Sequence, residues 1–298
     1  MIEFPFEIGF PDRGFREKFR AAFLKTSPES CVTTIGKSLI GEELELYKIG
    51  RGGMRILYTG AHHGAERLTA NVAYAFLRAM AEKEKKKGRL GTIDVRLLLR
   101  EYTYYVIPLV NPDGAAMSDG LLGDNILRPR QVRMNGGEDF KKWSANARGV
   151  DLNHNYDAGF FEYKRIEERE GIVAGRGKFS GEYPESEPES RAVANAVRAI
   201  SPSLVLSLHS QGREVYYSPR NAKTAALAMR AARMLGYERK LPTGTAEYGG
   251  LSDYTGAVLG IPSLTVEMGN GENPLPTGEY YRHRDRLVNL MARLPTLL

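Results

Sequence analysis

The sequence predicts an α/β fold, in which helices pack against a β-sheet, and three observations support this prediction. Apolar runs of five to eight residues alternate with helical patterns along the chain. The 298 residues are 42% hydrophobic and 26% charged, an ordinary globular composition with enough apolar residues for a sizeable core. No internal repeat or low-complexity linker interrupts the pattern. We therefore expect a single domain over residues 1–298.

The apolar runs predict strands near 43–49, 54–59, 103–110, 204–209, 213–218 and 263–267. Helical patterns lie near 66–87, 187–200, 221–235 and 279–294. For the second helix, Ser186, Pro188 and Glu189 form a capping-box pattern that predicts its start. Gly236 is a natural residue to follow the third helix. Two long stretches between these elements, about 111–160 and 160–186, are rich in Gly, Asn and Asp, which is typical of loops that form the walls of a site.

Composition excludes several classes of protein. No stretch of about 18 apolar residues could span a membrane, and the first twenty residues carry acids and prolines where a secretory signal would be apolar. We therefore expect a soluble protein without a membrane span, located in the cytoplasm. The single cysteine, Cys31, excludes an internal disulfide, and we expect it to be buried and inert. The net charge of +6 owes much to residues 82–90, which have the pattern of a solvated helix end, so we expect no nucleic-acid partner.

A possible metal site follows the predicted strand at 54–59. His63 and Glu66 are three residues apart, so a loop-to-helix junction can direct both side chains at one point, whereas His62 lacks this spacing. The flanking Gly60 and Gly64 allow the backbone to turn sharply between strand and helix. The pair alone is a weak signal, since it is also compatible with a surface histidine beside a glutamate at a helix N-terminus.

Two further residues end predicted strands. His209 closes the apolar run "LVLSLH", and with His63 and Glu66 it makes a set of two nitrogens and one oxygen that suits a catalytic Zn²⁺. Glu267 closes the run "SLTVE", where a buried carboxylate is costly unless it has a partner or a chemical role. Taken singly, His209 is more readily interpreted as a hydrogen-bonded core histidine, and Glu267 as a salt-bridged edge glutamate.

Together the motifs resemble the M14 zinc carboxypeptidase family, and within it the γ-D-glutamyl-L-diamino acid peptidases that cut bacterial cell-wall peptides. In chain order, the segments that carry the resemblance are "IGKSLIGEELELYKIG", "GAHHGAERLTAN", "IPLVNPDG", "NARGVDLNHNYD", "SGEYPESEPESRAV", "SLHSQG" and "IPSLTVEMGNGENPLP". The ordered set is specific and covers nearly the whole chain. The resemblance implies a mixed β-sheet flanked by helices.

The resemblance also implies roles for individual residues. It assigns the ligands of one zinc ion to His63, Glu66 and His209 and the general base to Glu267. The implied reaction is attack of metal-activated water, whose proton Glu267 accepts and later delivers to the leaving amine. Arg148, in "NARGVDLN", is the candidate for stabilising the oxyanion.

One departure from the family concerns substrate recognition. Typical carboxypeptidases have Asn-Arg where this chain has Asn153-His154, and they use that pair to bind the C-terminal carboxylate of the substrate. Without the guanidinium, His154 is a weaker replacement, either a substrate contact or a structural residue. Three loop residues are further candidates for substrate binding, namely Tyr248, Asp253 for a basic group and Arg213 for a carboxylate.

The expected function is hydrolysis of the bond between γ-D-glutamate and meso-diaminopimelate, or a related diamino acid, in peptides derived from peptidoglycan. Two other enzymes of the same chemistry remain open: a zinc carboxypeptidase acting on ordinary peptides and a small-molecule deacylase of the aspartoacylase type. A non-enzymatic binder of peptidoglycan fragments is a further alternative. The presence of both histidines, the ligand glutamate and Glu267 argues against it.

Overall fold

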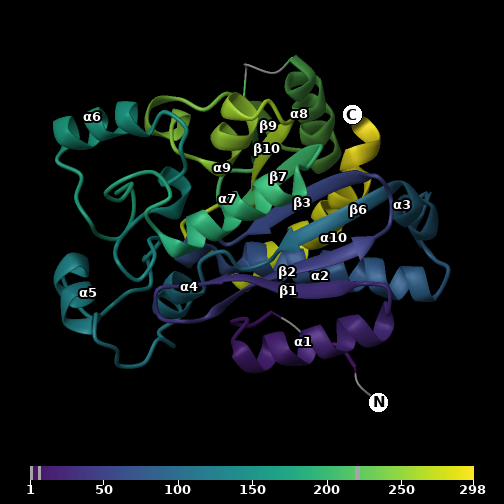
Figure 1. The fold of residues 1–298 in the computed structure, drawn as a ribbon, viewed down its shortest axis with the longest axis horizontal. Coiled ribbons are helices and arrows are strands. Elements are labelled where there is room, and N and C mark those ends of the chain that lie inside the picture. The colour runs from purple at the N-terminus through teal and green to yellow at the C-terminus, as the bar shows by residue number, and fades with distance from the viewer. Residues whose placement is uncertain (1–2, 6–7, 219–221) are drawn as a thin grey trace.

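The computed structural model describes residues 3–5, 8–218 and 222–298. Within these residues, eight strands form one mixed sheet in the order β1-β2-β6-β3-β7-β10-β8-β9 (Figure 1). The short strands β4 and β5 pair with each other in a separate two-stranded sheet. The strands are β1 Cys31–Lys37, β2 Glu43–Gly50, β3 Met54–Gly60, β4 Arg89–Leu90, β5 Ile93–Asp94, β6 Tyr102–Ile107, β7 Leu204–His209, β8 Glu214–Tyr217, β9 Glu238–Lys240 and β10 Ser263–Glu267. The mixed α/β architecture confirms the predicted fold class.

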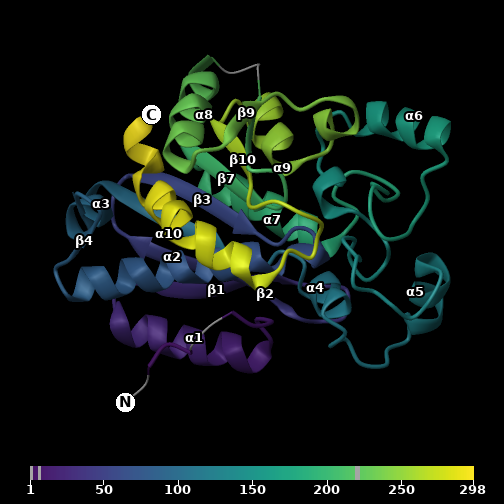
Figure 2. The same ribbon diagram turned by 180° about the vertical axis from the view of Figure 1, so that it is seen from behind.

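Helices cover both faces of the sheet. Figure 1 shows α7 in front of the strands, and Figure 2 shows α2 and α10 across the opposite face. The loops around α4, α5 and α6 form a lobe beside the sheet. The helices are α1 Arg13–Thr26, α2 Arg67–Lys85, α3 Val95–Glu101, α4 Pro112–Ser118, α5 Arg128–Asn135, α6 Phe160–Glu170, α7 Pro188–Ile200, α8 Ala222–Leu235, α9 Leu251–Asp253 and α10 Thr277–Arg293.

Alternating side chains of the central strands form two separate cores. Ile56 and Tyr58 of β3 pack in the larger core, with apolar residues of α2, α8 and α10. Leu57, between them, packs in a second core on the other face, with Val193 and Val197 of α7. Because successive strand residues point to opposite faces, strands buried on both sides are mostly apolar. This explains why apolar residues predominate in the segments of β3 and β7.

The parallel strands β3, β7 and β10 bring the candidate residues to one edge of the sheet. In the register, Gly60 at the end of β3 pairs with Leu208, and His209 at the end of β7 pairs with Glu267 at the end of β10. The carboxyl ends of parallel strands are where α/β proteins usually form their sites.

Several expectations need correction. Cys31 is exposed, because it begins β1 at the edge of the sheet. The capping box at Ser186 is wrong: α7 begins at Pro188, with Glu187 as N-cap, and the Ser186 hydroxyl donates to the Glu187 carboxylate instead. The helix expected near 221–235 is α8, and residue 221 lies outside the described residues.

The predictions also left some elements unassigned. They include α1, α3 and β1, and the helices α4, α5 and α6 inside the two stretches interpreted as loops. Among the described residues, no helix is long and apolar enough to cross a membrane.

Candidate active site

The connection after β3 places His63 and Glu66 at the edge of the sheet. Ala61 adopts a left-handed conformation, with φ 49°, which turns the chain sharply out of the strand. The Ala61 N–H donates to the Thr69 hydroxyl at 2.8 Å, and that hydroxyl donates to the Glu66 carbonyl at 2.8 Å. A 3₁₀ turn, Gly64–Glu66, then leads into α2. These bonds fix the start of α2 beside the strand, with the His63 side chain just before it.

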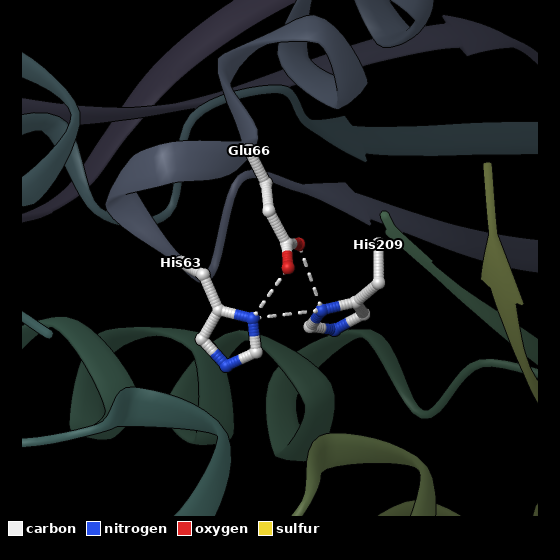
Figure 3. Close-up of side chains that lie close together, drawn as sticks. All are labelled: His63, Glu66 and His209. Atoms are coloured by element: carbon white, nitrogen blue, oxygen red, sulfur yellow. Dashed lines mark hydrogen bonds and ion pairs between the residues drawn. The ribbon is translucent and has the colours of Figure 1, made fainter. Parts of the chain in front are cut away.

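His63, Glu66 and His209 converge on one point (Figure 3). His63 Nδ1 lies 2.9 Å from Glu66 Oε1, and His209 Nδ1 lies 3.1 Å from Glu66 Oε2. The two Nδ1 atoms are 3.3 Å apart. Two nitrogens that bind one tetrahedral Zn²⁺ at ordinary bond lengths are separated by about 3.3 Å, so the three side chains fit this ion as ligands.

In the described part of the chain, this triad is the one cluster of three His, Cys, Asp or Glu side chains whose ligand atoms lie close enough to hold a metal ion. Further side chains orient it. The second ring nitrogen of each histidine lies on the side of the ring away from Glu66 in Figure 3. His63 Nε2 is 3.1 Å from Asp151 Oδ1, and His209 Nε2 is 3.1 Å from the Ser207 hydroxyl. The Asn273 amide donates to Glu66 Oε1 at 3.2 Å.

Electrostatics within the triad favour a charged carboxylate. Burial by itself would raise the pKa of Glu66, but the adjacent imidazoles of His63 and His209 lower it to about 2. Burial likewise opposes the charged form of His63, but the carboxylates of Glu66 and Asp151 raise its pKa well above the ordinary value. The triad is therefore an anionic pocket that favours a cation, whether a proton or a metal ion.

His62 lies outside the triad, as the spacing predicted. Its ring is buried beneath the sheet edge, where Nε2 is 3.0 Å from the Tyr156 hydroxyl and Nδ1 is 3.5 Å from the Ser207 hydroxyl. Burial, with His209 and His63 nearby, lowers the pKa of His62 well below its ordinary value. A neutral imidazole at this place fits a hydrogen-bonding role.

Glu267 lies beside the triad at the end of β10. Burial, together with the nearby Glu66 carboxylate, raises its pKa well above the ordinary value, while His63 opposes the rise. A cation bound by the triad would lower the pKa of Glu267 again, since its positive charge would lie close to the Glu267 carboxylate. Glu267 is thus a carboxyl group whose proton affinity is tuned by the charge of the metal site.

A cavity of about 230 Å³ opens in front of Glu267 and His63. Of the expected substrate-binding residues, it is lined by Asn153, His154, Tyr248 and Asp253. The cavity is also lined by residues that the sequence analysis did not single out, among them Asp151, Tyr216, Tyr217, Ser218, Ser252 and Thr265. Among the described residues, those that line the cavity include no arginine or lysine, and their formal charges come from carboxylates.

His154 is held rigidly at the wall of this cavity. Its ring stacks on Tyr163, with ring centroids 4.2 Å apart and an angle of 11° between the planes. His154 Nδ1 lies 2.8 Å from the Tyr248 carbonyl, which can only accept, so Nδ1 carries the proton. Burial lowers the pKa of His154, and Asp151 opposes the change. A neutral imidazole therefore lies at the position where the resemblance to the family would imply a guanidinium.

The two arginines expected at the site do not line the cavity. The Arg148 side chain is 42% exposed, and its Nε lies 3.6 Å from Glu187 Oε2. The Arg213 guanidinium donates to the Gly236 carbonyl at 3.1 Å and lies over the Tyr237 ring. The interpretation of Arg213 as a carboxylate-binding residue is therefore not supported by its position.

Asp151, Ser207 and Asn273 contact the triad but were missed in the sequence. Asp151 lies within the motif "DLNHN", and Ser207 lies two residues before His209 on the same strand. Strand residues two apart point to the same face, which was the available signal for Ser207. No comparable pattern connects Asn273 with Glu66, because they meet only in the folded chain.

Comparison with known proteins agrees with this geometry. Residues 17–284 match the family model for zinc carboxypeptidases. A γ-D-glutamyl-L-diamino acid endopeptidase of Lysinibacillus sphaericus is 29% identical over 83% of this chain and 63% of its own length. Carboxypeptidase B of Bos taurus is 26% identical over 78% of this chain and 48% of its own length. The chain thus spans less than two thirds of the length of these relatives.

A solved structure shows the same fold. The structure of bovine thrombin-activatable fibrinolysis inhibitor superposes with a TM-score of 0.74 at 19% identity, covering 95% of both chains. The family match covers most of the chain, and the triad fits the zinc ion that gives the family its name. The chain therefore belongs to the zinc carboxypeptidase family.

Proposed function

We propose that this enzyme hydrolyses the amide bond between γ-D-glutamate and meso-diaminopimelate, or a related diamino acid, in peptides derived from peptidoglycan. The observation that carries the proposal is a metal triad with Glu267 beside it. Both face a cavity whose described lining residues include carboxylates but no arginine or lysine. The similarity to the L. sphaericus endopeptidase supports the same reading.

In the proposed reaction, His63, Glu66 and His209 hold one zinc ion. Zinc at this place would activate water for attack and polarise the scissile carbonyl. Glu267 accepts the proton that the attacking water releases and returns it to the leaving amine. Asp151 accepts from His63 Nε2 at 3.1 Å, so the proton of that ring stays away from the metal.

The cavity offers groups for the diamino acid on the leaving side. The Asp253 carboxylate, at the end of α9, suits an ammonium group. The Asn153 Oδ1 atom accepts from the Leu251 N–H at 3.2 Å, which leaves its amide nitrogen to donate to a carboxylate. His154, protonated on Nδ1, presents its other nitrogen as an acceptor. A zwitterionic amino-acid end group matches this mixture better than a single anion does.

The direct test is to incubate the purified protein with L-Ala-γ-D-Glu-meso-diaminopimelate, with and without a chelator, and to analyse the products by mass spectrometry. We expect L-Ala-D-Glu and diaminopimelate, and no turnover after zinc is removed. Release of L-alanine instead, or turnover that survives the chelator, would contradict the proposal.

Two alternatives remain testable in the same assay. An ordinary carboxypeptidase would release C-terminal residues from α-linked peptides, as the similarity to carboxypeptidase B allows. A deacylase would cleave N-acyl amino acids and leave the tripeptide intact. A cytoplasmic location stays a prediction, which fractionation of the native cells would test.

A further inference from the structure

A buried hydrogen-bond chain leads from His209 away from the metal triad. His209 Nε2 lies 3.1 Å from Ser207 Oγ, Ser207 Oγ lies 3.5 Å from His62 Nδ1, and His62 Nε2 lies 3.0 Å from the Tyr156 hydroxyl. All four residues are at most 1% exposed. Since buried polar atoms need partners, the protons along this chain must be arranged consistently.

Metal binding fixes the first proton of the chain. Because Nδ1 of His209 faces Glu66 and the other histidine, it must be unprotonated to bind a metal, and the ring proton then sits on Nε2 and is donated to Ser207. The Thr59 hydroxyl also donates to Ser207 Oγ, at 3.2 Å. These two donors occupy both acceptor positions of Ser207, so its own hydrogen is directed at His62 Nδ1.

The remaining protons follow from this arrangement. With Nδ1 accepting, neutral His62 carries its proton on Nε2 and donates it to the Tyr156 oxygen. The distances alone also allow the opposite direction of the hydrogen bonds, with Tyr156 as the first donor. In that case Ser207 donates to His209 Nε2, and the ring proton of His209 sits on Nδ1, where it blocks the metal. The direction of the chain therefore decides whether His209 can be a ligand.

The two histidines of the triad differ in this respect. His63 Nε2 contacts the Asp151 carboxylate, which can only accept, so its tautomer is determined by one partner. His209 Nε2 contacts a hydroxyl, which can donate or accept. The tautomer of His209 is consequently set by the groups that follow Ser207 in the hydrogen-bond chain, His62 and Tyr156.

We propose that Ser207, His62 and Tyr156 are positioning residues that hold His209 in the tautomer with a free Nδ1. The proposal rests on the metal site proposed above, and it extends that site by three residues that touch neither metal nor substrate. Removing partners of metal-bound histidines typically weakens metal binding about 10–100-fold.

The test measures zinc affinity by competition with a chelator in Ser207→Ala, Tyr156→Phe and the double variant. We expect Ser207→Ala to raise the zinc Kd by about 10–100-fold and Tyr156→Phe to raise it less. In the Ser207→Ala background, Tyr156→Phe should have no further effect, because the chain is already interrupted. Equal effects of Tyr156→Phe in both backgrounds would overturn the proposal.

Two matched controls separate this effect from a general loss of stability. Ser263→Ala removes a buried hydroxyl of β10, 2.7 Å from Thr255, and Tyr104→Phe removes a buried bond of 2.8 Å to the Ala292 carbonyl. Both should lower the melting temperature without changing the zinc Kd. A zinc Kd that changes as much in these controls as in Ser207→Ala would show a merely structural effect.

A measurement on the unmodified protein is independent of the variants. In the zinc-loaded protein, ¹⁵N NMR should find the ring proton of His62 on Nε2, whereas a proton on Nδ1 would overturn the proposal. His209→Ala distinguishes the failure of the metal site itself. If that variant still binds zinc, the ligand assignment is wrong. If it loses zinc while Ser207→Ala binds as tightly as the unmodified protein, only the positioning chain is wrong.

Discussion

Replacing Glu267 by glutamine should remove most of the catalytic rate while leaving the fold and the zinc in place. Glutamine keeps the shape of the side chain but cannot accept a proton from water. A general base typically contributes about 10²–10⁴-fold, which corresponds to about 2.7–5.4 kcal/mol of transition-state stabilisation. Because burial and the Glu66 carboxylate already favour the uncharged form of Glu267 and raise its pKa, an uncharged amide should not destabilise the folded protein.

The assay compares kcat/KM on the γ-linked tripeptide with zinc content and melting temperature. Glu214→Gln is the matched control, since Glu214 pairs with Glu267 in the register between β8 and β10. The Glu214 carboxylate is held by Lys240 and by the Tyr216 hydroxyl, so we expect it to accept no proton from the attacking water. If Glu267→Gln retains zinc and a nearly unchanged rate, or if Glu214→Gln loses as much activity, Glu267 is not the base.

Three further predictions follow from the site and its surroundings. His63→Ala should strip the zinc, whereas His62→Ala should only weaken zinc binding. Metal analysis of both variants tests this, and the reverse result would mean that His62 and not His63 is the zinc ligand. Arg148→Ala should cost roughly 2–4 kcal/mol in kcat/KM if the guanidinium reaches the oxyanion, whereas an unchanged rate with lower stability would show that it serves only its ion pair with Glu187. Burial, with other carboxylates nearby, raises the pKa of Glu189 from 4.5 to about 7. The folded state therefore binds the proton of the Glu189 carboxyl group more tightly than the unfolded state does. This proton stabilises the folded protein fully below pH 4.5, and the stabilisation is lost as the pH rises through 7. The loss amounts to about 3 kcal/mol, and urea unfolding from pH 4 to 8 should show it in the unmodified protein and not in Glu189→Gln. An identical pH dependence of the two proteins would contradict this account.

The central strands and their terminal residues were predictable because local sequence determines them. β7 and β10 match the expected ranges because they are apolar runs buried on both faces, and their last residues are His209 and Glu267. Two members of the metal triad were predictable from a local property, the spacing of His63 and Glu66, and His209 was predictable as the last residue of an apolar strand. A local signal for helix α1 lies in Phe15, Phe19 and Phe23, which recur at helical spacing.

The residues that orient the site were not predictable, because their contacts are made between distant parts of the chain. Asn273 reaches Glu66 across 207 positions of sequence, and Tyr156 reaches His62 across 94. Composition likewise did not indicate where charge would lie. The chain carries a net charge of +6, yet Arg148 and Arg213 are engaged outside the cavity. The assignment of substrate contacts from charge alone failed for Arg213 for this reason.

The central claim is that the enzyme cleaves a γ-linked amide on the carboxyl side of D-glutamate. The most direct measurement compares kcat/KM for L-Ala-γ-D-Glu-meso-diaminopimelate with that for the isomer in which the same residues are joined through the α-carboxyl group. Peptides ending in an α-linked lysine, arginine or phenylalanine are measured alongside. We predict zinc-dependent release of diaminopimelate from the γ-linked isomer and little cleavage of the others. Faster cleavage of any α-linked peptide would contradict the claim.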